Sequence, residues 1–193
     1  MNMDLARTAS APGTLEGIRM EHRADPGASV TPRDFKNGMR RLASGVSIIS
    51  TVHEGTFHGL AATAVTSVSA DPPTLLVCVN RSASSHDPLV DSRRFCVNVL
   101  AEEDHDIATR FGSSLDRASR FQSREWTKLT TGAPALIGSL ACFDCTVVDI
   151  IAASTHTLLF GQVVDLRTWA DEVKPLLFWD GRYHLRSDQR GRG

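Results

Sequence analysis

Two runs of small and hydroxyl-bearing residues have the composition of a ligand-binding surface. The first extends from Gly59 to Ser69 and alternates Gly, Ala, Thr and Ser with aliphatic residues, and the second is Asn80-Arg-Ser-Ala-Ser84. Small side chains let backbone N–H groups approach a flat or anionic ligand, and hydroxyls with one arginine can hold a phosphate. The same residues also suit a tightly packed strand and an ordinary Ser-rich turn, so residue types alone leave both interpretations open.

The cysteines do not form a metal-binding pattern. Cys142-Phe-Asp-Cys145 is an isolated C-x-x-C, because Cys78 and Cys96 do not provide the second pair of a zinc ribbon. In a strand, residues three apart point to opposite faces, so Cys142 and Cys145 cannot easily share an ion. We expect buried free thiols and no metal site.

Other familiar chemistries lack their motifs as well. There is no G-x-G-x-x-G and no G-x-x-x-x-G-K-[ST], so neither common phosphate loop is present. His53, Glu54 and His58 resemble H-E-x-x-H with one residue too many, and they span a predicted turn. No serine lies in a G-x-S-x-G elbow, so serine hydrolysis has no local support.

The elements that must position the two runs are mostly β-strands. Many short strands separated by turns favour a closed or nearly closed barrel, and the absence of a βαβ alternation argues against a Rossmann sheet. The Asp180-Gly181 pair predicts a type I′ hairpin turn, and Thr31-Pro32 predicts a helix start. Strands are predicted at 46–52, 61–69, 74–79, 95–100, 140–153 and 157–166. A further strand is predicted to start at Phe57, after the turn that follows the first strand. Helices are predicted from 32 to before Gly45 and at 102–111, and Asp87-Pro88 is predicted to open a short helix. Residues 113–131 are predicted to be a loop with a short helix.

Length and charge limit the class of protein. The 193 residues carry a net charge of -1, with 41% hydrophobic residues. This balance is unlike the basic surface of nucleic-acid-binding proteins, and no apolar run approaches the roughly 18 residues that span a bilayer. We expect one domain at 31–187, a flexible leader at 1–30, a tail at 188–193 and a cytoplasmic location, with neither nucleic acid nor membrane as a partner.

The two runs and several later segments together resemble the short-chain flavin reductases. These are the small reductase components of two-component flavin-dependent monooxygenases, and the resemblance is greatest to the 4-hydroxyphenylacetate 3-monooxygenase reductase. It covers roughly residues 32–187. The matching segments are Gly59 to Pro73, Leu75 to Ser84, Phe35 to Val46, Phe95 to Leu100, Arg120-Phe121 with Trp126, Gly132 to Leu136, Phe143 to Cys145, Thr155-His156 with Phe160-Gly161, and Trp179 to Tyr183.

The resemblance implies a mainly β fold, an FMN-binding split β-barrel of Greek-key type with a few peripheral helices. It also implies a homodimer that transfers hydride from NADH or NADPH to FMN or FAD and supplies reduced flavin to a separate monooxygenase. The implied cofactor-binding residues are Ala62, Thr63, Ala64 and Val65 along the isoalloxazine, Asn80, Arg81, Ser82 and Ser84 at the ribityl chain and phosphate, Phe111 and Arg120 at the flavin rim, and Tyr183 near the cleft.

His156 is the residue that the resemblance assigns to catalysis, beside the nicotinamide. On residue type alone, a strand-end histidine satisfied by its neighbours is the simpler interpretation. Hydride transfer is the cofactors' own chemistry, so no nucleophile or strong base is required of the protein. The alternative function is a non-catalytic flavin- or haem-binding split-barrel module.

Overall fold

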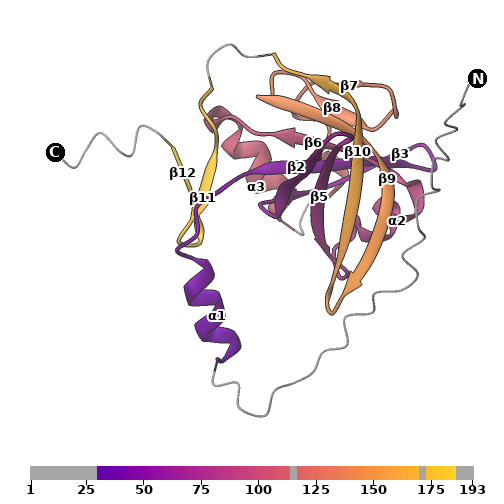
Figure 1. Ribbon diagram of the computed structural model, residues 1–193. Helices are drawn as coiled ribbons and strands as arrows, with labels where there is room; N and C mark the ends of the chain where they lie inside the picture. The colour runs from indigo at the N-terminus through magenta and orange to yellow at the C-terminus, as the bar shows by residue number, and fades with distance from the viewer. Residues whose placement is uncertain (1–29, 114–116, 170–172, 186–193) are drawn as a thin grey trace, which may run out of the picture.

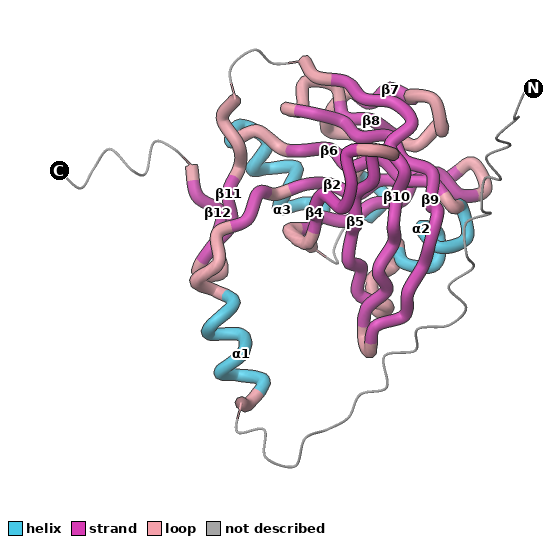
Figure 2. Tube along the Cα trace, in the orientation of Figure 1, coloured by secondary structure: helices cyan, strands magenta, loops and turns pink. Residues whose placement is uncertain are grey.

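A computed structural model describes residues 30–113, 117–169 and 173–185 (Figure 1). Apart from Val30, the predicted leader at 1–30 lies outside the described residues, as does the predicted tail at 188–193. Both therefore stay predictions. Secondary structure in the described part is dominated by strands, with three short α-helices at the periphery (Figure 2). The expected mainly β class is confirmed.

Seven antiparallel strands form the main sheet, in the order β3-β2-β6-β9-β10-β5-β4. Their bounds are β2 Ser47–His53, β3 Thr56–Ala62, β4 Val65–Ala70, β5 Pro73–Asn80, β6 Arg94–Val99, β9 Ala141–Ala153 and β10 His156–Arg167. The two edge strands, β3 and β4, are consecutive in the chain and are joined only by Thr63 and Ala64. So short a link forces the sheet to curl until its edges approach, which makes a barrel that is split between β3 and β4.

The predicted continuous strand at 61–69 is therefore wrong. The chain leaves β3 at Ala62 and begins β4 at Val65, because it passes there from one edge of the sheet to the other. The carbonyl of Ala64 already accepts a hydrogen bond from the amide of Cys78 at 3.0 Å, which attaches the link to β5. The alternation of small residues gave no sign of this break.

The barrel interior holds the main hydrophobic core. The strands β2, β5, β6, β9 and β10 supply most of its buried members, which include Ile49, Val77, Phe95 and Leu159. Gly161 on β10 faces this core so closely that a Cβ there would lie 2.9 Å from both Cε1 of Phe95 and Cβ of Cys145. The absence of a side chain at this position is therefore a packing requirement.

The outer face of the barrel is covered by α3 and a small sheet. Helix α3 spans His105–Gly112 and follows a 3-10 turn, η1, at Glu102–Asp104, so the predicted helix at 102–111 begins in a tighter form. In the small sheet, β11 (Leu177–Trp179) lies between β1 (Ser44–Gly45) and β12 (Arg182–His184) and pairs with both. Asp180 and Gly181 have φ angles of 50° and 76°, which confirms the predicted hairpin turn.

The remaining elements are short. Helix α1 spans Pro32–Met39 and begins in a capping box between Thr31 and Asp34, as the Thr-Pro start predicted, but it ends earlier than expected. Helix α2 spans His86–Ser92. The segment predicted as a loop with a short helix contains that helix, η2 at Arg117–Ser119, and also β7 at Trp126–Lys128, which pairs with β8 at Pro134–Leu136.

The four cysteines are free thiols. Cys142 and Cys145 belong to different buried clusters, on opposite sides of β9, as their spacing predicted. In the described part of the chain, no three His, Cys, Asp or Glu side chains gather as a metal site would require. Likewise, none of the described helices combines the length and apolar character needed to cross a lipid bilayer.

Candidate functional site

The sheet order places the two ligand-suited runs side by side. Because β5 lies between β4 and β10, the link at Ala64 adjoins Cys78, and Asn80 at the end of β5 pairs directly with His156. The amide of Arg81 then donates to the carbonyl of Thr155 at 3.0 Å. Residues separated by almost a hundred positions thus meet at one end of the barrel.

The turn after β5 is organised by its own polar side chains. The carboxamide oxygen of Asn80 accepts hydrogen bonds from the amide of Ser82 at 2.9 Å and from its hydroxyl at 2.8 Å. The hydroxyl of the buried Ser85 donates to the carbonyl of Gly59 at 2.9 Å and so ties the turn to β3. Ser84 stays exposed between these two anchored positions. The carboxamide oxygen of Asn80, a residue predicted to bind the ligand, is therefore used to shape the turn.

A cavity of about 240 Å³ lies between this turn, β3 and the end of α3. It brings together four of the predicted site residues: Ser82, Ser84, Phe111 and Arg120. The other lining residues are Leu60, Ala61, Ala83, Ser85, Gly112, Ser113 and Arg117. Its wall combines hydroxyls, two guanidinium groups and one aromatic ring, which is the composition of a site for an anion attached to an apolar group.

Arg120 is the most unusual group in this wall. Its side chain is buried, with 6% of the residue exposed. One guanidinium nitrogen donates to the carbonyl of Gly59 at 2.9 Å, the other terminal nitrogen donates to the carbonyl of Ser113, and Nε has no hydrogen-bond partner. Burial, and then the like charge of Arg117, lowers the pKa of the guanidinium. Within the described residues no carboxylate forms an ion pair with it, so none of these residues compensates its positive charge.

Phe111 forms the apolar side of the cavity. Its ring is almost fully buried, meets Phe121 edge-on with centroids 5.1 Å apart, and lies under the guanidinium of Arg120 at 5.7 Å. The ring also approaches the backbone of β3, where a Cβ on Gly59 would lie 2.8 Å from Cε1 of Phe111. Glycine at position 59 is thus required by the closeness of α3 to β3.

The other predicted residues do not line this cavity. The Tyr183 hydroxyl reaches the end of α3, 3.5 Å from the position of a Cβ on Gly112, and burial raises the pKa of this phenol. His156 is half-buried, and its Nδ1 shares a hydrogen bond with the Thr155 hydroxyl at 2.9 Å. Arg81 is exposed. Ala62 and Val65 are half-buried, whereas Thr63 and Ala64 are exposed at the split of the barrel.

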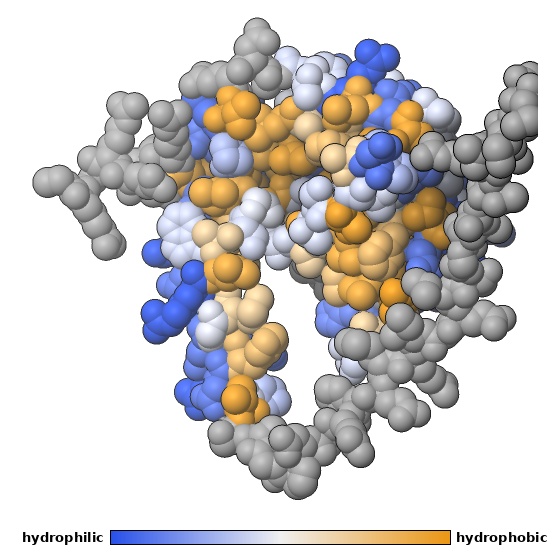
Figure 3. Space-filling model, viewed as in Figure 1, coloured by the Kyte–Doolittle hydropathy of each residue, from blue (hydrophilic) through white to orange (hydrophobic). Residues whose placement is uncertain are grey.

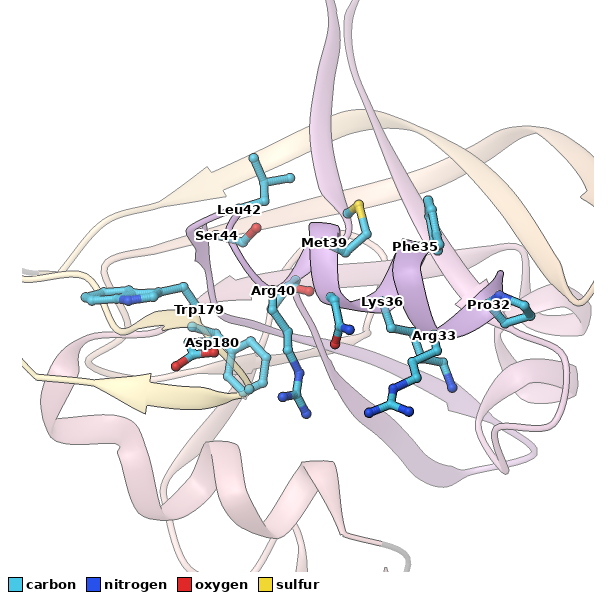
Figure 4. A pocket seen from close by; sticks show the side chains of 14 residues that line it. Pro32, Arg33, Phe35, Lys36, Met39, Arg40, Leu42, Ser44, Trp179 and Asp180 are labelled. Carbon is cyan, nitrogen blue, oxygen red and sulfur yellow. The ribbon is translucent and has the colours of Figure 1, made fainter. Parts of the chain in front are cut away.

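Thr63 faces a different hollow, formed with α1 and the β11–β12 hairpin. This hollow has a volume of about 790 Å³. Helix α1 projects from the body of the protein (Figure 1) and carries apolar side chains on one side and cationic ones on the other (Figure 3). In Figure 4, Phe35, Met39 and Leu42 lie on the first side, and Arg33, Lys36 and Arg40 on the second.

Two polar side chains of the site, Ser85 and Arg117, and the carbonyl of Gly59 were not among the residues predicted to bind the cofactor. Ser85 and Arg117 line the cavity, and Gly59 supplies the carbonyl that both Ser85 and Arg120 bind. The signal for Ser85 was its position directly after the Ser82–Ser84 run. Arg117 had no signal beyond its spacing of three residues from Arg120.

Residues 39–185 match the family described as "Flavin reductase like domain". This match spans most of the chain, including the barrel and every residue of the cavity wall. The chain belongs to the flavin reductase like domain family.

Individual relatives of this flavin reductase-like chain agree with the family match. It is 42% identical over 161 residues to the FMN reductase (NADH) RutF of Pantoea ananatis, covering 83% of this chain and 84% of that protein. The crystal structure of a nitrilotriacetate monooxygenase component B homologue from Mycobacterium thermoresistibile superimposes with a TM-score of 0.75 at 34% identity, covering 83% and 89% of the two chains. The NADH:FAD oxidoreductase SgcE6 of Streptomyces globisporus, solved with NAD and FAD fragments, gives 0.73 at 26% identity, with 80% and 94% covered.

Proposed function

We propose that this chain is an NAD(P)H-dependent flavin reductase, which reduces FMN or FAD with NADH or NADPH. The observation that carries the proposal is the buried guanidinium of Arg120, which has no counter-ion among the described residues and lines a cavity beside the small-residue link of the barrel. A flavin phosphate supplies the missing negative charge. The FMN reductase (NADH) among the relatives, at 42% identity, supports the same activity.

The residues at the site fit a flavin phosphate. Nε of Arg120 is buried without a partner, and the exposed hydroxyls of Ser82 and Ser84 line the same cavity. Charge-assisted hydrogen bonds to a phosphate are stronger than those between neutral groups, so Arg117 and Arg120 would hold its oxygens. Small side chains at Ala62 and Ala64 would leave their backbone accessible to a flat ring, with Thr63 and Val65 beside them.

The bound flavin and nicotinamide supply the hydride-transfer chemistry themselves. The protein's contribution is to bind and orient both. His156 pairs with Asn80 on the adjacent strand. Its side chain would position the nicotinamide amide or move a proton to the reduced flavin. Arg81 would bind the phosphate from the exposed side, and Tyr183 would close the cleft near the end of α3. Phe111 would exclude water from the inner side of the cavity.

The decisive experiment measures oxidation of NADH and of NADPH with FMN, FAD and riboflavin as acceptors. We expect turnover with at least one pair of nicotinamide donor and flavin acceptor. The absence of turnover with all six pairs would refute the proposal. Flavin binding without nicotinamide oxidation would instead identify a binding module. In the same assay, His156→Ala should raise the KM for the nicotinamide more than the flavin Kd, and Arg81→Ala should do the reverse.

We also propose that the protein is a homodimer, with α1 packed against a second copy. No residue of α1 is buried within its own chain, and 62% of Phe35 and 47% of Met39 are exposed. An isolated helix of eight residues is not stable in water and needs tertiary contacts on its apolar side. Because Thr63 lines the same hollow as this helix, the second copy would also border the flavin site.

Release of reduced flavin to a separate flavin-dependent monooxygenase completes the proposed role. The monooxygenase component named in one structural relative supports this assignment. A cytoplasmic location is proposed as well, since the four cysteines remain thiols, and disulfides are rare in reducing compartments.

A further inference from the structure

The turn after β5 and the start of α2 are bonded to the residues on both sides of His156. The amide of Arg81 donates to the carbonyl of Thr155 at 3.0 Å. Five residues further along the chain, Nε2 of His86 shares a hydrogen bond with the Thr157 hydroxyl at 2.9 Å. The segment that would bind the flavin phosphate thus grips the strand immediately before and immediately after the histidine expected beside the nicotinamide.

The His86 link is built so that it persists in both protonation states of the ring. The imidazole is largely enclosed, with 13% of the side chain exposed, and its Nδ1 lies 2.7 Å from Oδ1 of Asp87. A carboxylate only accepts hydrogen bonds, so Nδ1 carries the hydrogen, and Nε2 of the neutral ring accepts from the buried Thr157 hydroxyl. In the protonated ring Nε2 donates to the hydroxyl oxygen instead.

Helix α2 does not depend on His86 for its place in the fold. Leu89 is fully buried in the barrel core, and at the other end of the helix the Ser92 hydroxyl shares a hydrogen bond with the Thr51 hydroxyl on β2 at 2.8 Å. Replacement of His86 would therefore leave the helix attached and release only the link to β10. The link controls where the turn lies relative to β10.

Thr157 passes this constraint to His156 through the backbone. Successive side chains of a strand point to opposite faces, so the Thr157 hydroxyl and the His156 imidazole lie on different sides of β10. His86 itself lies outside the lining of the cavity. A misplacement of about 1 Å caused by a mutation far from the reacting atoms can lower a rate about a hundredfold, so a link of this kind can control the rate without touching a ligand.

We propose that His86 is a positioning residue of the reductase, which holds the turn that carries Ser82 and Ser84 in a fixed place relative to His156. This inference rests on the proposed function, in which the turn binds the flavin phosphate and His156 meets the nicotinamide. Because His86 acts through Thr157, its loss should misplace the two binding groups relative to each other while the protein stays folded.

Replacement of His86 by leucine and by glutamine separates the hydrogen bond from the packing. A glutamine amide can take the place of Nε2 and bond to Thr157, whereas leucine cannot. At saturating NADH and FMN, His86→Leu should lower kcat about tenfold, and His86→Gln should stay within about threefold of the unaltered protein. Ser92→Ala is the matched control, because it removes the bond at the other end of α2. It should lower the midpoint of urea unfolding and leave kcat within about twofold.

Thr157→Val removes the other partner of the same bond, so its effect on kcat should not add to that of His86→Leu. Additive losses, an equal loss in His86→Gln and His86→Leu, or an unchanged kcat in His86→Leu would each overturn the proposal. A protein that oxidises neither NADH nor NADPH would refute the reductase activity alone. The FMN Kd from fluorescence titration would then still test the link, since it should rise about threefold in His86→Leu but not in His86→Gln.

Discussion

Gly59→Ala should damage both the stability of the protein and its flavin site. The new Cβ would lie 2.8 Å from Cε1 of Phe111, whereas carbon atoms in contact are normally about 3.5–4.0 Å apart. The Phe111 ring would therefore have to move by roughly 0.7–1.2 Å. That ring is fully enclosed, with Phe121 and Trp126 packed against it at centroid distances of 5.1 and 5.8 Å. Overpacking of this kind costs about 1–3 kcal/mol of unfolding free energy.

The displaced ring would also disturb the cavity. Phe111 lines it, and the Gly59 carbonyl accepts hydrogen bonds from both Ser85 and Arg120. We therefore expect the FMN Kd to rise about tenfold, which corresponds to about 1.4 kcal/mol of binding free energy. Flavin fluorescence titration measures this Kd, and urea unfolding measures the loss of stability.

Gly161→Ala is the matched control for this effect. Its Cβ would meet Phe95 and Cys145 in the barrel interior at 2.9 Å, so it should lower the unfolding free energy at least as much. Neither contact belongs to the cavity wall, so the FMN Kd measured on the folded variant should stay within twofold of the original. If Gly59→Ala lost stability like the control but bound FMN normally, the assignment of Phe111 to the flavin site would be refuted.

Phe35→Asp should convert the proposed homodimer to monomers in sedimentation velocity, because it places a charge in the apolar side of α1, whereas Lys36→Ala on the opposite side should leave the dimer intact. An unchanged dimer in Phe35→Asp would exclude α1 from the interface. Burial raises the pKa of Cys145 from 9.0 to about 12. Between these values the unfolded chain loses the proton first, so stability falls as pH rises, by about 1.4 kcal/mol per pH unit. Urea unfolding of Cys145→Ala should show a correspondingly shallower decline from pH 9 to 12, and identical slopes would contradict the shift.

Local interactions explain which parts of the fold the sequence could predict. The hairpin at Asp180-Gly181 depends on two residues that tolerate positive φ, and the start of α1 depends on the reciprocal hydrogen bonds between Thr31 and Asp34. Both signals lie within four residues of the feature they predict. The end of α1 was misjudged because the apolar spacing continues to Leu42, although the helix has stopped at Met39.

Non-local interactions explain what the sequence could not predict. The break at Thr63 and Ala64 depends on the order of the strands, which places β3 and β4 at opposite edges of the sheet. The roles of Ser85 and Arg120 depend on hydrogen bonds to Gly59, which is 26 residues from one and 61 from the other. The family resemblance brought Ser82, Ser84, Phe111 and Arg120 into one predicted site, and the structure gathers these four in one cavity.

The split of the barrel and the position of the cavity have a common structural origin. Because β3 is an edge strand, its outer side has no neighbouring strand to complete a ladder, and unpaired backbone groups there must find other partners. At Gly59 the partners are the Ser85 hydroxyl and the Arg120 guanidinium. Satisfying one backbone carbonyl thus brings a buried cation and a serine turn to the edge of the sheet, next to the link that joins its two edges. The positive charge left there is an energetic cost to the free protein, and an anionic ligand that binds beside it removes that cost.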